Sequence, residues 1–151
     1  MSKNLKAFLD MIAYSEGTDN GRQPTKNHGY DVLVGGGLFT SYADHPRVLV
    51  NLRPGLASTA AGRYQVLSRY FDAYKKQLNL PDFSPESQDA IAIQLIKECG
   101  ALRDIEAGYI DIALAKCKSR WASLPGAGYG QYEHEKGKLI AAYKKAGGSI
   151  A

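Results

Sequence analysis

The stretch Ile12–Gly21, IAYSEGTDNG, marks the point where a helical pattern stops and a glycine-rich pattern begins. Before it, apolar residues recur at the spacing i, i+3, i+4, i+7 and i+8, at Leu5, Phe8, Leu9, Ile12 and Ala13. This stripe is typical of an amphipathic helix and predicts a helix over residues 3–15. Gly17 readily adopts the left-handed conformation that follows a helix, so the helix is expected to end at Ser15 or Glu16.

Glu16 is thereby placed at the carboxyl end of the predicted helix, where the helix dipole disfavours a negative charge. A carboxyl group in that position is expected to have a raised pKa. A carboxyl group that stays protonated near neutral pH is what a general acid requires. The alternative interpretation of Glu16 is an ordinary solvated glutamate at a helix end.

The composition is that of a globular protein, with 44% hydrophobic and 23% charged residues. The 151 residues are expected to form one domain, residues 1–151, with a core of its own. The net charge of +4 suits a polyanionic partner. No run of five or six basic residues occurs, so a nucleic-acid partner is not expected.

Two features of the sequence bear on where the protein acts. Lys3, Lys6 and Asp10 interrupt the apolar residues at the N-terminus, which argues against a signal peptide. No apolar stretch approaches the roughly 20 residues that span a bilayer, so no stable membrane association is expected.

Cys99 and Cys117 are too few for a disulfide framework and are expected to be free structural thiols.

The rest of the chain predicts an α+β domain that is mostly helical with a small antiparallel β region. Residues 30–34 and 38–42 flank three glycines and predict a β-hairpin. After Gly62 an apolar stripe predicts a helix with these side chains in the core: Tyr64, Leu67, Tyr70, Phe71 and Tyr74. Further helices are predicted over residues 85–99, 101–107, 110–118 and about 133–146.

Four segments carry a resemblance to a known family, in the same order along the chain: Tyr14–Gln23, Asn27–Val32, Ser58–Gln65 and Trp121–Gln131. They resemble the lambda-type phage endolysins, and the likeness extends over nearly the whole chain. The resemblance implies a lysozyme-like fold with two lobes and a saccharide cleft between them. It also implies a lytic transglycosylase in which Glu16 is the catalytic acid. No cofactor is expected, and no metal is expected because the histidines and cysteines lack the spacing of metal ligands.

The resemblance further implies a substrate, and residues that bind it. The substrate would be the glycan strands of peptidoglycan, cleaved at the MurNAc–GlcNAc β-1,4 bond to lyse the host cell. Matched positions imply substrate-binding roles for Thr18, Tyr30, Asp31, Gln65 and Tyr129. Gln65 could bond sugar hydroxyls or begin a helix, and Tyr129 could stack on a sugar or fold onto the core. The protein is expected to be a monomer of the host cytoplasm that a holin releases to act in the periplasm.

A hydrolytic muramidase is the first alternative, because hydrolysis of a glycosidic bond usually needs a second carboxylate. The candidates are Asp19, Asp31 and Asp44. Many phage lysozymes carry an aspartate nine residues after the catalytic glutamate and a threonine fifteen residues after it. Here those positions hold Thr25 and Asp31, so that pattern fails.

Two other classes of function are weighed against glycosidic cleavage. A zinc amidase would need ligands among three histidines and two cysteines, which lack the close spacing typical of zinc sites: His28, His45, His134, Cys99 and Cys117. A basic module that binds wall polymer without cutting it would not need Glu16. Loss of turbidity of a peptidoglycan suspension distinguishes binding from cutting.

Overall fold

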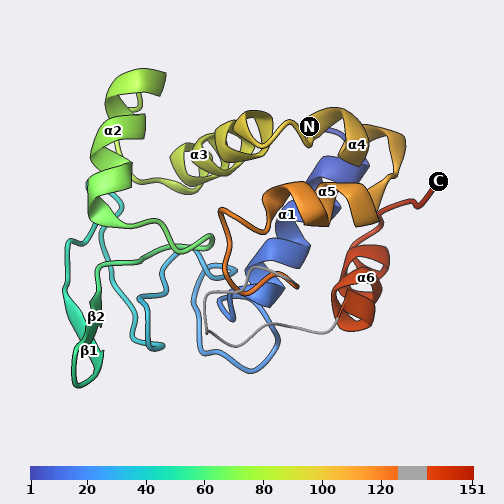
Figure 1. The fold of residues 1–151 in the computed structure, drawn as a ribbon. Helices are drawn as coiled ribbons and strands as arrows, with labels where there is room; N and C mark the ends of the chain where they lie inside the picture. The colour runs from blue at the N-terminus through green and yellow to red at the C-terminus, as the bar shows by residue number, and fades with distance from the viewer. Residues whose placement is uncertain (126–135) are drawn as a thin grey trace. The chain divides into compact units, whose positions relative to one another are not determined.

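The computed structural model describes residues 1–125 and 136–151, and these residues form six helices and one two-stranded sheet (Figure 1). In chain order the elements are α1 (Lys3–Ser15), β1 (Val50–Arg53), β2 (Leu56–Ser58), α2 (Ser68–Leu78), α3 (Pro85–Glu98), α4 (Leu102–Ala107), α5 (Ile110–Cys117) and α6 (Lys136–Lys145). β1 and β2 pair antiparallel, with Val50 opposite Ser58. The predicted α+β class, mostly helical with a small antiparallel region, is confirmed.

The contacts divide the chain into two compact units. The first unit joins Met1–Glu16 to Ala92–Ala151, and the second is Gly17–Ile91. The expectation of one domain over residues 1–151 stays a prediction. The described residues contain no helix long and apolar enough to cross a membrane.

The first unit is built around α1, which packs against α4 and α6 (Figure 1). Ser2 caps the helix by accepting a hydrogen bond from the Leu5 amide, and the apolar stripe predicted from the sequence is buried. Asn4 fastens the start of α1, because its Nδ2 donates to the Ile105 carbonyl and its Oδ1 accepts from the Ser149 amide. α1 is thus held at its start and along its length, which fixes where its carboxyl end lies.

The core of the second unit is aromatic. The rings of Phe71 and Phe83 lie 5.1 Å apart, and the ring of His45 lies 4.9 Å from that of Phe83. His45 accepts the Arg47 amide at Nδ1, which leaves its Nε2 to donate to the Val66 carbonyl at 2.8 Å. Burial lowers the pKa of His45, which favours the neutral imidazole that packs among the aromatic rings of this core.

The predicted hairpin at residues 30–42 is wrong as a regular pair of strands. The chain does reverse at the glycines, but only one isolated antiparallel bridge forms there, between Val32 and Leu38. The regular strands are β1 and β2, where most side chains are exposed. Because neither strand buries one face, neither shows the alternating pattern that identifies a strand in a sequence.

The aromatic stripe after Gly62 is corrected in two respects. The helix begins at Ser68, because the preceding residues form a bridge between Ala61 and Val66. Tyr70 is 49% exposed rather than part of the core, whereas Phe71 and Tyr74 are buried as predicted.

Most of the remaining local predictions agree with the structure. Ser84 accepts the Ser87 amide at the start of α3, which is the predicted cap. Helices α4 and α5 lie within the predicted ranges. The helix predicted over about residues 133–146 corresponds to α6, Lys136–Lys145, and residues 133–135 lie outside the described part. Both cysteines are free; Cys117 is buried, and Cys99 is only partly so.

Candidate active site

Glu16 is the residue that ends α1. Its backbone is still helical and its amide donates to the Ile12 carbonyl at 2.8 Å, while Gly17 turns into the left-handed region at φ +77°. As a residue, Glu16 is partly exposed. The local pattern that predicted the helix end therefore also sets the position of this carboxyl group, at the junction of α1 and the turn that follows it.

Burial raises the pKa of Glu16 to about 7 from its ordinary value of 4.5. A hydrogen bond donated by Ser123 Oγ to Glu16 Oε2 opposes this rise, because it favours the charged form. Among the described residues, no charged side chain contributes to the shift. A group with this pKa is available as an acid and as a base near neutral pH.

The raised pKa makes a prediction for stability. The folded state binds the Glu16 proton more tightly than the unfolded state does. The resulting stabilisation is fully present below about pH 4.5 and is lost as the pH rises through 7. We expect Glu16→Gln to gain about 2–3 kcal/mol over the wild type between pH 5 and pH 8. Urea unfolding of both proteins across this range measures the change.

The matched control for this measurement is Glu106→Gln, which removes an exposed carboxylate from α4. Its free energy of unfolding relative to the wild type should change little between pH 5 and pH 8. If the difference in free energy of unfolding between the wild type and Glu16→Gln were also independent of pH, ionisation of the buried Glu16 carboxyl group would not cost stability.

The second unit contains a polar cluster centred on Arg63, a residue that the sequence did not single out. Its guanidinium lies 5.4 Å from the Tyr30 ring centroid and 5.5 Å from that of Tyr64. It donates to the His28 carbonyl at 2.9 Å and to the Tyr64 hydroxyl at 3.1 Å, and it pairs with Asp19 at 3.3 Å. Arg63 is only 5% exposed, so these contacts link buried parts of the second unit.

Asp89 completes the cluster and was also missed. Its Oδ1 accepts hydrogen bonds from the hydroxyls of Tyr30 at 2.8 Å and Tyr64 at 2.6 Å. Burial, followed by its own hydrogen bond to Asp89, raises the pKa of Tyr30 to about 12, and burial also raises the pKa of Tyr64. Tyr30, which is expected to bind substrate, thus has its hydroxyl engaged by Asp89.

Two other predicted substrate-binding residues are buried. Thr18 is 1% exposed and donates to the Arg63 carbonyl at 2.6 Å. Asp31 is 4% exposed and accepts from the Thr25 hydroxyl at 2.5 Å and the Lys26 amide at 3.0 Å. Both side chains hold loops together, and their burial argues against direct contact with a substrate.

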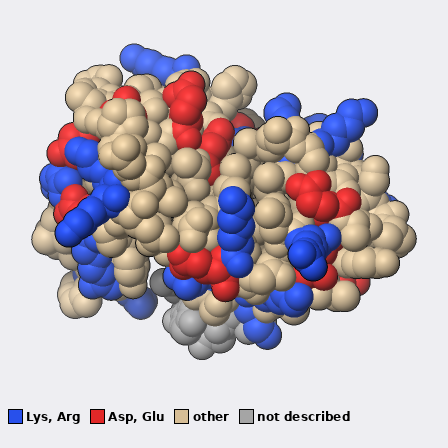
Figure 2. All heavy atoms as spheres, turned by 90° about the horizontal axis from the view of Figure 1, so that it is seen from above, with Lys and Arg blue, Asp and Glu red and all other residues tan. Residues whose placement is uncertain are grey.

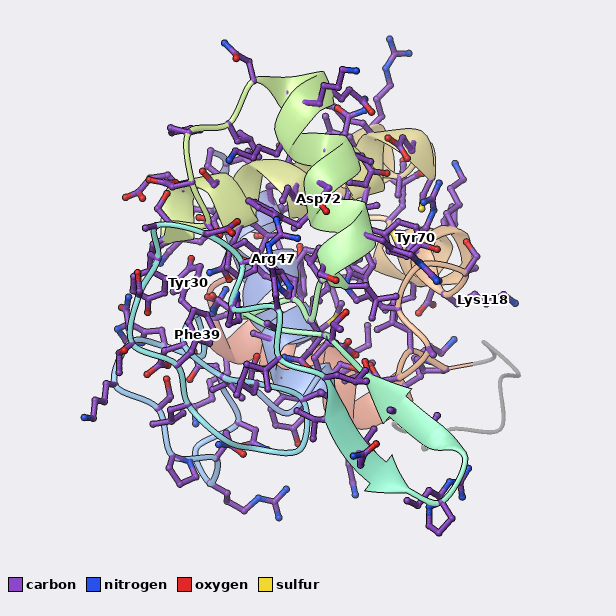
Figure 3. The ribbon with its side chains drawn as sticks, turned by 90° about the vertical axis from the view of Figure 1, so that its left-hand side faces the viewer. Tyr30, Phe39, Arg47, Tyr70, Asp72 and Lys118 are labelled. Carbon is purple, nitrogen blue, oxygen red and sulfur yellow. The ribbon has the colours of Figure 1, made fainter. Side chains whose placement is uncertain are left out.

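The remaining candidates for a second carboxylate are ion-paired. Arg47 forms ion pairs with Asp44 and with Asp72, and Figure 3 shows the pair of Arg47 and Asp72. Hydrogen bonds from Arg47 lower the pKa values of both carboxyl groups, so they stay ionised. Asp19 is paired with Arg63. Asp44, Asp72 and Asp19 are thus each ion-paired with an arginine guanidinium group.

Gln65 has a fixed side chain and an unusual backbone. Its φ is +56°, and its Nε2 donates to the carbonyls of Gly62 at 2.9 Å and Val32 at 3.3 Å. No described residue donates to its Oε1. Tyr129, the other predicted sugar-binding residue, lies outside the described residues.

The described residues show no group of three or more histidine, cysteine, aspartate or glutamate side chains that could hold a metal ion. His28 is exposed and His45 belongs to the aromatic core, while His134 lies outside the described part. Basic and acidic side chains are interspersed on the face drawn in Figure 2, so the excess positive charge is not gathered there.

Comparison with known proteins agrees with the resemblance in the sequence. The family described as Endolysin matches residues 6–150. The endolysin of Escherichia phage lambda is 67% identical over 96% of this chain and 92% of its own length. The endolysin of Escherichia phage P2 is 54% identical over 97% of this chain and 94% of its own length.

Two solved structures of the lysozyme of bacteriophage lambda match over 100% of this chain and 98% of theirs, at 64% identity. The one complexed with a chitohexasaccharide has a TM-score of 0.99, and the other has a TM-score of 0.94. These matches confirm the lysozyme-like fold class. Together with the family match, they show that the chain belongs to the endolysins, the enzymes with which phages lyse the cell wall.

Proposed function

We propose that this endolysin is a lytic transglycosylase that cleaves the MurNAc–GlcNAc β-1,4 bond of peptidoglycan. The observation that carries the proposal is the partly exposed Glu16 at the end of α1, with its pKa raised to about 7. A carboxyl group of this pKa serves as acid in one step and as base in the next without help from a second group.

In the first step the Glu16 carboxyl protonates the glycosidic oxygen, and the bond from that oxygen to MurNAc C1 breaks. In the second step the C6 hydroxyl oxygen of the same MurNAc bonds to C1, and its proton passes to the Glu16 carboxylate. The products are a 1,6-anhydro-MurNAc end and a GlcNAc with a free 4-hydroxyl, and no water is consumed. The tethered hydroxyl competes with solvent through its high effective concentration.

The interactions of the three candidate aspartates favour this chemistry over the alternative, a hydrolytic muramidase. A hydrolase usually needs a second carboxylate, as a nucleophile or to activate water. Asp31 is buried and bonded within its loop, while Asp44 and Asp19 are held by arginines. The proposed reaction needs Glu16 alone.

A glycan substrate is supported by the relative solved with a chitohexasaccharide, a chain of linked sugars. We assign to Gln65 Oε1 the role of accepting a hydrogen bond from a sugar hydroxyl or an N-acetyl N–H, which is supported by the engagement of its Nε2 with backbone carbonyls. Because its Nε2 is fixed by two carbonyls, the orientation of the amide is set before a ligand arrives.

We further propose that the protein works as a monomer without cofactor. It would be made in the host cytoplasm and reach peptidoglycan in the periplasm once a phage holin opens the inner membrane. Fractionation of cells that express the protein with and without a holin tests this proposal: lysis should require both. Lysis from the cytoplasm without a holin would contradict it.

The products decide between the two glycosidase mechanisms. We expect digestion of purified peptidoglycan to yield muropeptides that each lack one water relative to the products of a hydrolytic lysozyme. They should also lack a reducing end, because C1 is closed onto the C6 oxygen. Mass spectrometry with and without borohydride reduction measures both properties.

A hydrolytic lysozyme acting on the same peptidoglycan is the control, since its products are reduced by borohydride. If the fragments of this protein carried reducing MurNAc, the enzyme would be a muramidase. Asp19 would then be the first residue to replace, because its side chain is partly exposed.

A further inference from the structure

We propose that the hydroxyls of Ser123 and Ser15 form a hydrogen-bonded chain that holds Glu16 Oε2 and leaves Oε1 to exchange the proton with the substrate. This inference rests on the proposed role of Glu16 as acid and then base. It assigns two positioning residues that the resemblance did not imply.

The chain is short and lies within the first unit. Ser123 Oγ donates to Glu16 Oε2, and the oxygens of Ser123 and Ser15 lie 2.7 Å apart. Ser15 is the last residue of α1, directly before Glu16, and it is only 4% exposed. No described residue donates to Glu16 Oε1. The two oxygens of the carboxyl group are therefore not equivalent.

The turn that carries Ser123 is anchored on both sides. The Trp121 amide donates to the Cys117 carbonyl at the end of α5, and the Leu124 amide donates to the Trp121 carbonyl at 3.0 Å. Trp121 is 3% exposed and Leu124 is fully buried. Ser123 is thus held between two core side chains, which fixes its hydroxyl toward the end of α1.

A hydroxyl suits this place because it both donates and accepts. When Glu16 is ionised, Ser123 donates to Oε2, and Ser15 donates to the Ser123 oxygen, which strengthens the bond to the carboxylate. When Glu16 carries its proton on Oε1, Oε2 is a carbonyl oxygen and still accepts from Ser123. The orientation of the carboxyl group is therefore kept through both steps of the proposed reaction.

Replacement of Ser123 by alanine removes the donor to the charged form, so the pKa of Glu16 should rise above its wild-type value. A hydrogen bond to a charged group is worth enough to move the alkaline limb of the pH–rate profile up by about one pH unit. We expect the maximal rate to fall about tenfold or more, because the carboxyl group loses its fixed orientation. Ser15→Ala should move the limb in the same direction and by less.

The experiment compares Ser123→Ala, Ser123→Thr and Ser15→Ala with the wild type in a peptidoglycan assay from pH 4 to pH 9. A carbon-13 NMR titration of the Glu16 carboxyl group gives the same pKa without activity. Ser123→Thr keeps the hydroxyl and should restore much of the wild-type profile. Ser119→Ala is the matched control, an exposed serine of the same turn region that should leave both profiles unchanged.

A merely structural role for Ser123 would lower the melting temperature and leave the pH profile and the Glu16 titration in place, and that result would overturn the inference. Failure of the proposed function is recognised separately, since Glu16→Gln would then retain activity. If Glu16→Gln is inactive and Ser123→Ala titrates like the wild type, only the positioning role is wrong.

Discussion

Glu16→Gln is expected to fold and to lose a factor of about a hundred to ten thousand in the rate of peptidoglycan cleavage. Glutamine keeps the shape of the side chain and can still accept from Ser123, but it has no proton to give to the glycosidic oxygen. The loss should therefore lie in turnover, not in binding. Turbidity loss of a peptidoglycan suspension gives the rate, and co-sedimentation with the same suspension gives the binding.

Glu106→Gln serves as the control here too, because it makes the same chemical change at an exposed position of α4. It should cleave at the wild-type rate. A well-folded Glu16→Gln variant with near-normal lysis would remove Glu16 from the mechanism. A wild-type protein that binds the suspension without clearing it would instead indicate a wall-binding module.

Arg63→Met is expected to lower the free energy of unfolding by about 3–5 kcal/mol, which for a chain of this size lowers the melting temperature by about 10 °C. Methionine fills part of the space beside the rings of Tyr30 and Tyr64 but removes every side-chain donor. The His28 carbonyl and the Asp19 carboxylate then lose a partner. Calorimetry gives the melting temperature.

The control for this prediction is Arg69→Met, which removes an arginine that also lies over a tyrosine ring, 5.0 Å from the centroid of Tyr70. Both Arg69 and Tyr70 are exposed, so the change should cost about 1 kcal/mol or less. Equal losses for the two variants would mean that the buried contacts of Arg63 contribute no more than a surface contact does.

Features that depend on neighbours along the chain could be predicted from the sequence. The apolar stripe before Ile12 and the glycine at position 17 fixed where α1 ends and hence where Glu16 lies. The cap at Ser84 and the glycines near residues 100 and 108 likewise marked helix boundaries. Helix periodicity and capping depend on residues that are close together in the chain, so they can be recognised in the sequence.

The contacts between side chains that are distant in the chain could be seen only in the tertiary structure, because such contacts produce no periodic pattern in the sequence. Ser123 lies 107 positions from Glu16 in the chain and yet bonds to it. Arg63 gathers Asp19, His28 and Tyr64, and Asp89 binds two tyrosine hydroxyls. Likewise, the sequence offered Thr18 and Asp31 as ligands for sugar, and only the fold buried them. The type of a polar residue does not show whether its side chain contacts a substrate or hydrogen-bonds a buried group of the protein. That depends on how the chain packs.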